Sequence, residues 1–252
     1  MDLGLKGKNV IVTGGSRGIG RSIALAFADE GANVAICARG MDALASVRDE
    51  LTARGVTAFA QSCDVGDAAA LAAFLDAANA ALGGVDVLVN NPSGFGLGDT
   101  EEAWSLGFNV DMMAAVRASR QVVPWMEARG GGAIVHISSI SGMEGTTRQA
   151  AYAAMKAAMI SHSKSLALTL APKNIRVNCV SPGSVEFPGG LWDQRKRDGS
   201  PLYEAIRTGI PFQRLGRPEE IAAAVVFCAS APASWVSGVN LPVDGGQHRA
   251  NL

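Results

Sequence analysis

A glycine-rich stretch near the beginning of the sequence has the residue types and the spacing that would hold the phosphates of a dinucleotide. Gly14, Gly18 and Gly20 lie between a short β-branched segment, 9–13, and an amphipathic helical pattern, 19–30. Glycine at such positions permits a tight turn, close approach of the backbone to a pyrophosphate, and close packing of the helix on the strand. The first N–H groups and the positive dipole end of the helix would face the phosphates. Because strand, loop and helix occur in this order, nucleotide binding is favoured over a purely structural turn.

Two arginines indicate which dinucleotide to expect. A ribose 2′-hydroxyl is usually held by an acidic residue at the end of the second strand, whereas a 2′-phosphate calls for Arg or Lys. The second predicted strand, 33–38, ends without a carboxylate and is followed by Arg39. Arg17, inside the glycine loop, would supply a second guanidinium, whose geometry suits a phosphate. These residues favour NADP(H) over NAD(H); the alternative is that both are solvated surface arginines.

The elements that must position these residues alternate along the chain. Short β-branched runs predict strands at 9–13, 33–38, 57–63, 85–90, 133–138, 175–181 and 239–243. Longer Ala- and Leu-rich stretches predict helices at 19–30, 42–54, 68–82, 101–127, 150–170 and 219–229. Parallel neighbours need a crossover of a dozen or more residues. The alternation therefore predicts an α/β fold, a Rossmann-type doubly wound parallel sheet of about seven strands with helices on both faces.

The length and charge of the chain narrow its class. A chain of 252 residues without a long linker or internal repeat fits a single domain, 1–252, that both binds the dinucleotide and carries the catalytic residues. With 22 Lys and Arg against 23 Asp and Glu, the formal charge is -1. No global electrostatic attraction to nucleic acid or anionic lipid is therefore expected.

The cysteines and the apolar segments exclude several further classes. The four cysteines are scattered, without a C-x-x-C pair or clustered histidines, so no metal site is expected and they are interpreted as small buried residues. The N-terminal residues show no basic segment followed by an apolar one, and the longest uncharged run, 221–243, is interrupted by prolines and polar residues. A cytoplasmic location without a membrane span is expected.

One irregular stretch, 184–211, is long for a loop in a compact domain. It contains Gly189 and Gly190, a cluster of charges and three bulky aromatic residues. Loops of this length are usually functional or disordered, and aromatic residues argue against plain disorder. A substrate-binding lid is the favoured interpretation.

With these elements in place, the sequence resembles the short-chain dehydrogenase/reductase family, in its single-domain branch. The glycine pattern T-G-x-x-x-G-x-G is matched by Thr13 to Gly20. Further matches are Cys63-Asp64-Val65, Asn90-Asn91, Ser139, Tyr152 with Lys156, Pro182-Gly183, and Val243-Asp244-Gly245-Gly246. The resemblance covers essentially the whole chain, and the motifs are specific because they occur together, in order and at the family's spacing.

The resemblance implies a set of site residues. Those expected to bind the cofactor are Gly14, Ser16, Arg17, Gly18, Ile19, Gly20, Arg39, Asp64, Val65, Asn90, Asn91, Tyr152, Lys156, Pro182, Gly183 and Val185. Within that set, Asp64 and Val65 would lie against the adenine, Asn90 or Asn91 near the ribose, and Val185 near the nicotinamide carboxamide. The catalytic residues would be Ser139, Tyr152 and Lys156.

These three residue types suit hydride transfer between a carbonyl and an alcohol. Tyr152 and Lys156 are four apart on a predicted helix and therefore share one face. A phenol with an ordinary pKa near 10 is a poor acid-base group at neutral pH, and a nearby ammonium ion favours the phenolate. Tyr152 would protonate the carbonyl oxygen, Ser139 would hydrogen-bond it, and Lys156 would also hold the nicotinamide ribose. His136 and His162 are interpreted as structural.

Three departures from the family pattern concern the active site. The family's further catalytic residue is an Asn, and counting from Trp104 and back from Pro124 reaches Asp111 both times. The carboxylate of Asp111 could still accept hydrogen bonds, but its charge would favour protonated Lys156 and oppose a phenolate. The pattern N-N-A-G becomes Asn90-Asn91-Pro92-Ser93-Gly94, with one extra residue. Phe187 replaces a frequent Thr.

The departures suggest an apolar substrate side. Its expected residues are Phe95, Met143, Phe187, Trp192 and Tyr203. The sequence thus predicts an NADP(H)-dependent oxidoreductase acting on a small apolar ketone, 3-oxoacyl group or alcohol, similar to 3-oxoacyl carrier-protein reductases and related ketoreductases. The alternatives are an NAD-dependent secondary alcohol dehydrogenase and a non-catalytic dinucleotide-binding regulator. The resemblance also implies a homotetramer or homodimer that pairs the helices 101–127 and 150–170.

Overall fold

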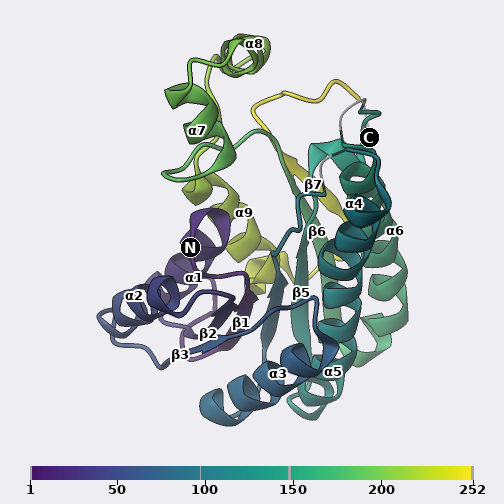
Figure 1. Cartoon of the computed structure of the whole chain (residues 1–252). Coiled ribbons are helices and arrows are strands. Elements are labelled where there is room, and N and C mark those ends of the chain that lie inside the picture. The colour runs from purple at the N-terminus through teal and green to yellow at the C-terminus, as the bar shows by residue number, and fades with distance from the viewer. Residues whose placement is uncertain (1, 97, 147–148, 251–252) are drawn as a thin grey trace.

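The computed structural model describes residues 2–96, 98–146 and 149–250, and these contain a seven-stranded sheet in which the paired strands are parallel (Figure 1). The strands are β1 (Asn9–Thr13), β2 (Asn33–Ala38), β3 (Ala58–Ser62), β4 (Val87–Asn90), β5 (Gly132–Ile137), β6 (Ile175–Pro182) and β7 (Asn240–Val243). Their order across the sheet is β3-β2-β1-β4-β5-β6-β7. The predicted doubly wound parallel sheet is confirmed, and every strand lies within two residues of its expected bounds.

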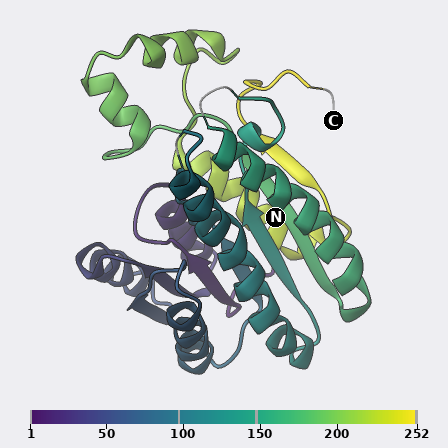
Figure 2. The same cartoon turned by 45° about the vertical axis from the view of Figure 1, so that its right-hand side comes forward.

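Helices cover both faces of the sheet. They are α1 (Gly18–Asp29), α2 (Met41–Thr52), α3 (Ala68–Leu82), α4 (Glu101–Leu106), α5 (Ala114–Ala128), α6 (Ala150–Leu170), α7 (Leu191–Arg197), α8 (Pro201–Gly209) and α9 (Pro218–Ala229). Short 3-10 turns occur at Ile140–Gly142, Ala171–Lys173 and Ala231–Ala233. Figures 1 and 2 show α1, α2 and α9 on one face and α3, α5 and α6 on the other. This arrangement explains why the strands are apolar on both faces.

Each face has its own apolar core. The first core joins α1, α2 and α9 to one face of the strands, with Ile23, Phe27 and Leu44 fully buried. The second joins α3, α5 and α6 to the other face, with Phe74 and Met126 fully buried. Two packed layers fix the sheet between them. The loops at the carboxyl ends of the strands therefore start from rigid positions.

The strand order reverses between β1 and β4, at the centre of the sheet. Thr13 at the end of β1 is paired with Asn90 at the end of β4, and the Thr13 hydroxyl donates a hydrogen bond to the Val89 carbonyl. In open α/β sheets, ligands bind in the crevice beyond the carboxyl ends of the strands at this reversal. The topology thus brings the glycine loop after β1 next to the Asn90-Asn91 segment after β4.

The helix predicted at 101–127 is not a continuous α-helix. It begins as α4 and ends as α5, but the intervening segment Gly107–Met113 has π-helical hydrogen bonding. Such wide turns are frequent at functional sites because they redirect one side chain without ending the helix. The buried carboxylate of Asp111 lies in this segment.

The stretch at 184–211 differs from the irregular loop that the sequence indicated. It contains the helices α7 and α8, which Figures 1 and 2 show beyond the carboxyl edge of the sheet. Gly189 and Gly190, which indicated a loop in the sequence, lie directly before α7, and Gly199 lies between α7 and α8. These glycines separate the helices and do not extend through them. Pro201 opens α8 at a position where its missing N–H costs nothing.

Three further expectations concern membrane-spanning helices, metal ligands and cysteines. Among the helices of the described residues, none is long and apolar enough to cross a membrane. The same residues contain no group of three or more potential metal ligands. All four cysteines are buried and free, which confirms their interpretation as small core residues.

We expect His136 to make the stability of the fold sensitive to mild acid. His136 is fully buried in β5, and Asn90 Nδ2 lies 3.2 Å from its Nδ1. Burial, followed by the nearby charges of His162 and Lys156, lowers the pKa of His136 to about 3. Below the ordinary histidine pKa the unfolded chain binds a proton that the folded chain does not, so this contribution to stability is present above pH 6.5 and is lost as the pH falls toward 3.

Urea unfolding of the wild type and His136→Asn between pH 7.5 and pH 5 measures this effect. At pH 5 the free energy of unfolding should be about 2 kcal/mol lower than at neutral pH because of His136. The variant is less stable at pH 7.5 because its packing is altered, but its stability should fall less steeply with pH. Parallel profiles for the two proteins would contradict the assignment.

Candidate active site

The glycine loop is held in a shape that only glycine permits. A Cβ on Gly20 would lie 2.1 Å from the Gly14 carbonyl oxygen, so α1 and the end of β1 approach more closely than any side chain allows. Gly14 and Gly18 have φ of 72° and 53°, in the left-handed region. Asn91 Nδ2 donates a hydrogen bond of 2.9 Å to Gly14 O. This hydrogen bond holds the segment after β4 against the glycine loop after β1.

The first turn of α1 is suited to an anion. Arg17 occupies the N-cap position, and among the described residues no side chain caps the helix and no acidic residue lies in its first turn. The early N–H groups of α1, at Gly18, Ile19 and Gly20, therefore lack a side-chain acceptor. Ser16 and Arg17 precede them in the loop, with Arg17 exposed. The glycine loop leaves space that any side chain would fill, and the helix that follows it begins without a side-chain cap. Both features fit the pyrophosphate of a dinucleotide.

The residues expected at the adenosine end lie in the loops after β1, β2 and β3. Arg17 and Arg39 are both exposed, and within the described part of the chain neither guanidinium has an ion pair or a hydrogen bond. Asp64 is exposed and accepts a hydrogen bond from the Gly66 N–H, while Val65 is buried. Asp64 also lines a pocket with residues of α4 and of the π-helical turn. The two arginines are thus available to an anionic group.

A buried ion pair lies beneath Tyr152. The side chains of Lys156 and Asp111 are 2% and 0% exposed, and Lys156 Nζ lies 3.2 Å from Asp111 Oδ1. That contact is an ion pair without a well-aligned hydrogen bond, since Oδ1 has no such partner among the described residues. Lys156 Nζ donates to the Ile137 carbonyl at 3.0 Å and lies 5.5 Å from the Tyr152 ring centre.

The ion pair keeps Lys156 charged. Burial alone would lower the pKa of Lys156, but the Asp111 carboxylate, with contributions from Tyr152 and Cys179, outweighs burial and raises it. Lys156 therefore retains its proton throughout the neutral range. A fixed ammonium ion next to a phenol is the arrangement that stabilises a phenolate, and the Asp111 carboxylate opposes part of that effect.

The segment that carries Ser139 packs against the same lysine. The Ser138 hydroxyl donates a 2.8 Å hydrogen bond to Lys156 O. A Cβ on Gly142 would lie 2.6 Å from the Lys156 carbonyl carbon, so the 3-10 turn after Ser139 lies directly on α6. Ser139 is buried, and its Oγ accepts a hydrogen bond from the Ser141 N–H at 3.1 Å. The structure thus joins Ser139, Tyr152, Lys156 and Asp111 through β5, α6 and the π-helical turn.

The remaining predicted cofactor residues flank this centre. Asn90 is buried and contacts His136, whereas Asn91 bonds to the glycine loop. Pro182 ends β6, and a Cβ on Gly183 would lie 2.7 Å from Asp244 Cβ. Val185 is buried and pairs with Gly216. The segments after β6 and β7 therefore lie against each other at the base of 184–211.

Sequence reasoning missed two residues that anchor this base. Gln247 Oε1 accepts a hydrogen bond from the Ser184 N–H at 2.8 Å, and Gln247 Nε2 donates to Ser184 Oγ. Glu186 accepts hydrogen bonds from Tyr203 Oη at 2.5 Å and Lys196 Nζ at 2.7 Å. The signal for Gln247 was its place directly after the Asp244-Gly245-Gly246 motif. No local signal identifies Glu186, because its partners lie ten or more residues along the chain.

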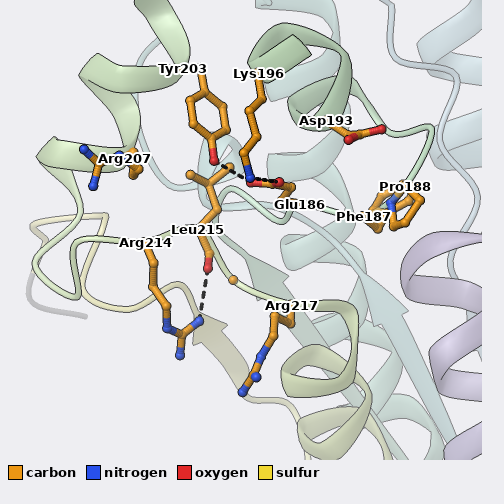
Figure 3. A pocket seen from close by; sticks show the side chains of 11 residues that line it. Glu186, Phe187, Pro188, Asp193, Lys196, Tyr203, Arg207, Arg214, Leu215 and Arg217 are labelled. Carbon is orange, nitrogen blue, oxygen red and sulfur yellow. Dashed lines mark hydrogen bonds and ion pairs between the residues drawn. The ribbon is translucent and has the colours of Figure 1, made fainter.

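The helices α7 and α8 have a small core of their own. Tyr203, Ile210 and Leu215 are buried together, with Trp192 and Ile206 packed against them. Figure 3 shows Tyr203 and Lys196 converging on Glu186, at one side of a pocket that Arg207, Arg214 and Arg217 also line. These arginines are paired, Arg207 with Glu204 and the other two with Glu220. The three arginines therefore share two carboxylates, and these pairs compensate their positive charge only in part.

The five expected substrate residues do not form one cluster. Phe95 stacks on the Tyr152 ring, with ring centres 5.7 Å apart and an angle of 9° between the rings. Met143 follows the turn that packs on Lys156. Trp192 and Tyr203 belong to the core of α7 and α8. The Phe187 ring lies on Gly18, where a Cβ would come within 2.5 Å of it, so Phe187 contacts the glycine loop.

Comparisons with known proteins cover almost the whole chain. A family model described as enoyl-(acyl carrier protein) reductase matches residues 14–248. The 7alpha-hydroxysteroid dehydrogenase of Escherichia coli K12 is 38% identical over 97% of this chain and 96% of its own. The 3-oxoacyl-[acyl-carrier-protein] reductase FabG of Chlamydia trachomatis is 40% identical over 96% of this chain and 98% of its own.

Solved structures agree with these sequence matches. The L-sorbose reductase of Gluconobacter frateurii, complexed with NADPH and L-sorbose, has a TM-score of 0.92 and 34% identity, with 100% of both chains covered. A 7 alpha-hydroxysteroid dehydrogenase complexed with NADH and 7-oxo glycochenodeoxycholic acid has a TM-score of 0.90 and 37% identity, over 97% of this chain and 96% of its own. The resemblance therefore extends from sequence to structure.

Gly20→Ala tests the close approach in the glycine loop. The added methyl group must push α1 away from Gly14, and overpacking of this kind typically costs about 1–3 kcal/mol of stability. We expect a lower unfolding midpoint in urea and at least about tenfold weaker dinucleotide binding, followed by fluorescence titration. The matched control is Gly40→Ala, whose new Cβ would meet nothing within 4 Å. Equal binding by both variants would contradict the role of the close approach.

Proposed function

The chain belongs to the short-chain dehydrogenase/reductase family of oxidoreductases, and from that premise we propose that it is an NADP(H)-dependent enzyme that interconverts a ketone or 3-oxoacyl group and a secondary alcohol. The observation that carries this proposal is the buried, charged Lys156 beneath the Tyr152 ring. A lysine that is 2% exposed is costly to bury, and the Asp111 carboxylate and the Ile137 carbonyl compensate it. Its place next to a phenol supports an acid-base role.

The proposed chemistry assigns one task to each side chain. Bound nicotinamide supplies or accepts the hydride. In the reducing direction Tyr152 gives its proton to the carbonyl oxygen, and the Ser139 hydroxyl donates a hydrogen bond to the same atom. The ammonium group of Lys156 stabilises the phenolate that Tyr152 becomes. In the oxidising direction the same phenolate takes the alcohol proton.

The cofactor would lie across the carboxyl edge of the sheet. Gly14, Gly18, Ile19 and Gly20 would hold the pyrophosphate with backbone N–H groups, with Ser16 beside them. Asp64 and Val65 would face the adenine, and Asn90, Asn91, Pro182, Gly183 and Val185 would border the ribose and carboxamide. Asn91 has a second task, since it already bonds to Gly14 O.

The preference for NADP(H) rests on Arg17 and Arg39. Both are exposed and have no carboxylate partner within the described residues. A relative of similar structure is complexed with NADPH and another with NADH, so the family permits either cofactor. The absence of a carboxylate directly after β2 supports the phosphorylated form.

The proposed substrate side begins at Phe95 and is completed by the segment 184–211. Phe95 is 55% exposed although it stacks on Tyr152, so one of its faces is open to a ligand. An aromatic wall next to the acid-base residue favours a ring or an acyl chain over a polyol. The structure of the similar L-sorbose reductase contains bound L-sorbose, so a sugar belongs in the test.

A panel of ketones with NADPH tests the function. We expect oxidation of NADPH with trans-1-decalone or ethyl 3-oxobutanoate and a lower kcat/KM with L-sorbose. Tyr152→Phe should lower kcat by about 100- to 10,000-fold, because it removes the group that transfers the proton, while NADPH binding persists. Tyr203→Phe, at the other tyrosine of the chain, should alter KM more than kcat. NADPH binding without turnover of any ketone would favour a regulator.

Arg39→Ala and Arg17→Ala test the choice of cofactor. Each should weaken NADPH binding by roughly 10- to 100-fold, since charge-assisted hydrogen bonds to a phosphate are lost, and should leave NADH binding nearly unchanged. Arg48→Ala on the exposed face of α2 is the matched control, because Asp49 is the only ion-pair partner of the Arg48 guanidinium among the described residues. If the ratio of NADPH to NADH affinity stays at the wild-type value in both variants, the enzyme is NAD-dependent or binds the phosphate elsewhere.

A further inference from the structure

Two hydrogen-bond donors converge on the buried carboxylate of Asp111. Lys156 Nζ lies 3.2 Å from Oδ1, and the Gly94 N–H donates a 3.0 Å hydrogen bond to Oδ2. Gly94 comes from the segment after β4, which has one residue more than the family pattern. The carboxylate thus joins the proposed acid-base centre to a segment on the substrate side.

An amide could not serve both donors. A carboxylate presents two acceptor oxygens, whereas the side chain of Asn presents one acceptor oxygen and one NH₂ group. Whichever way an amide is turned, its NH₂ group faces either the ammonium of Lys156 or the N–H of Gly94. A buried donor left without an acceptor loses its hydrogen bond and keeps its desolvation cost. The Gly94 N–H therefore gives a physical reason for Asp at a position where the family has Asn.

The backbone at Gly94, which donates a hydrogen bond to Asp111, is closely packed. A Cβ on Gly94 would lie 2.8 Å from Leu106 Cγ and 3.3 Å from Asp111 Oδ2, so the backbone here lies directly on α4 and on the carboxylate. The next residue, Phe95, has φ of 46°, in the left-handed region that bulky side chains rarely adopt. Ser93 Oγ accepts a 3.1 Å hydrogen bond from the Phe95 N–H.

This backbone conformation places the Phe95 ring on Tyr152. The rings stack with centres 5.7 Å apart, and the Lys156 ammonium lies 5.5 Å from the centre of the same Tyr152 ring. The contacts form a closed circuit from Lys156 through Asp111, Gly94 and Phe95 to Tyr152. Because Phe95 is half exposed, its stacked position depends on the backbone contacts of its own segment more than on core packing.

We propose that Asp111 is a positioning residue matched to the lengthened segment Pro92-Ser93-Gly94-Phe95, and that it sets the aromatic wall over Tyr152 as well as the position of Lys156. The proposal rests on the proposed function for its kinetic consequences. Two departures from the family pattern, the carboxylate at position 111 and the extra residue after Asn91, then form one coupled feature. Asp111 acts through Lys156 and Phe95 without touching the substrate.

A double-mutant cycle tests the coupling. The first change is Asp111→Asn, and the second restores the shorter segment by Pro92→Ala together with deletion of Ser93. In the wild-type segment, Asp111→Asn should lower kcat/KM for trans-1-decalone by about tenfold or more, because it leaves the buried Lys156 ammonium without its charged partner and sets an NH₂ group against one of the two donors. In the shortened segment the same change should cost less than about threefold or raise kcat/KM. An equal loss in both backgrounds would overturn the proposal.

A second cycle avoids the deletion, which could impair folding. Phe95→Ala leaves the backbone length unchanged and should raise KM for trans-1-decalone several-fold with a smaller change in kcat. If Asp111 acts through Phe95, adding Asp111→Asn to Phe95→Ala should raise KM no further and should only lower kcat, through Lys156. A further increase in KM, equal to that in the wild-type background, would contradict the proposal. Glu30→Gln, at an exposed residue of α1's C-cap, controls for the loss of one negative charge.

Amide hydrogen exchange separates this proposal from the proposed function. Exchange across residues 92–96 should be slow in the wild type and at least about tenfold faster in Asp111→Asn, because Gly94 loses its acceptor. The measurement needs neither cofactor nor turnover. If exchange is unchanged while Tyr152→Phe abolishes ketone reduction, the positioning role fails and the function stands. If exchange rises but Tyr152→Phe remains active, the positioning role stands and the function fails.

Discussion

The buried ion pair between Lys156 and Asp111 is the constraint on which the arrangement of the active site depends. Removing two charges from water is costly, and their attraction compensates that cost only when the geometry is fixed and the remaining hydrogen-bonding atoms find partners. The surrounding backbone supplies these partners: the Ile137 carbonyl accepts from Lys156, and the Gly94 N–H donates to Asp111. Gly142 packs closely on the backbone of α6 at Lys156, which fixes the position of the helix against the turn after Ser139. The pair therefore fixes three segments that are distant in sequence.

The sheet makes this convergence possible. Parallel strands end at a common edge, so the loops after β1, β4, β5 and β6 meet there although long helices separate them in sequence. The glycine loop and the Asn91 segment are joined by a hydrogen bond, and the Ser139 segment lies on α6. Two separate cores beneath this edge resist its deformation. The candidate catalytic residues are consequently held on segments that start from a sheet packed on both faces.

Sequence patterns predicted the sheet because strand and helix periodicities persist over many residues and do not depend on distant contacts. The π-helical turn at Gly107–Met113 was not predicted, because a wider turn has no composition of its own and arises from what Asp111 contacts. Counting along the chain still identified Asp111, since a position in a motif is independent of local geometry. The seven-residue helix α7 was missed for another reason. A helix this short is only marginally stable alone, and α7 depends on the packing of its Trp192 against the core that includes Tyr203 of α8.

The expected substrate residues illustrate the limit of assigning side chains from sequence order. Phe95 lies five residues past the end of β4, and its ring stacks on Tyr152. Phe187 lies only five residues past Pro182, yet its ring turns back onto Gly18 of the glycine loop. Phe187 packs against the first sheet core and is not among the residues of the separate core of α7 and α8. The core of α7 and α8 shares no residue with the ion pair. The Phe187 ring joins the base of the segment 184–211 to the glycine loop at Gly18.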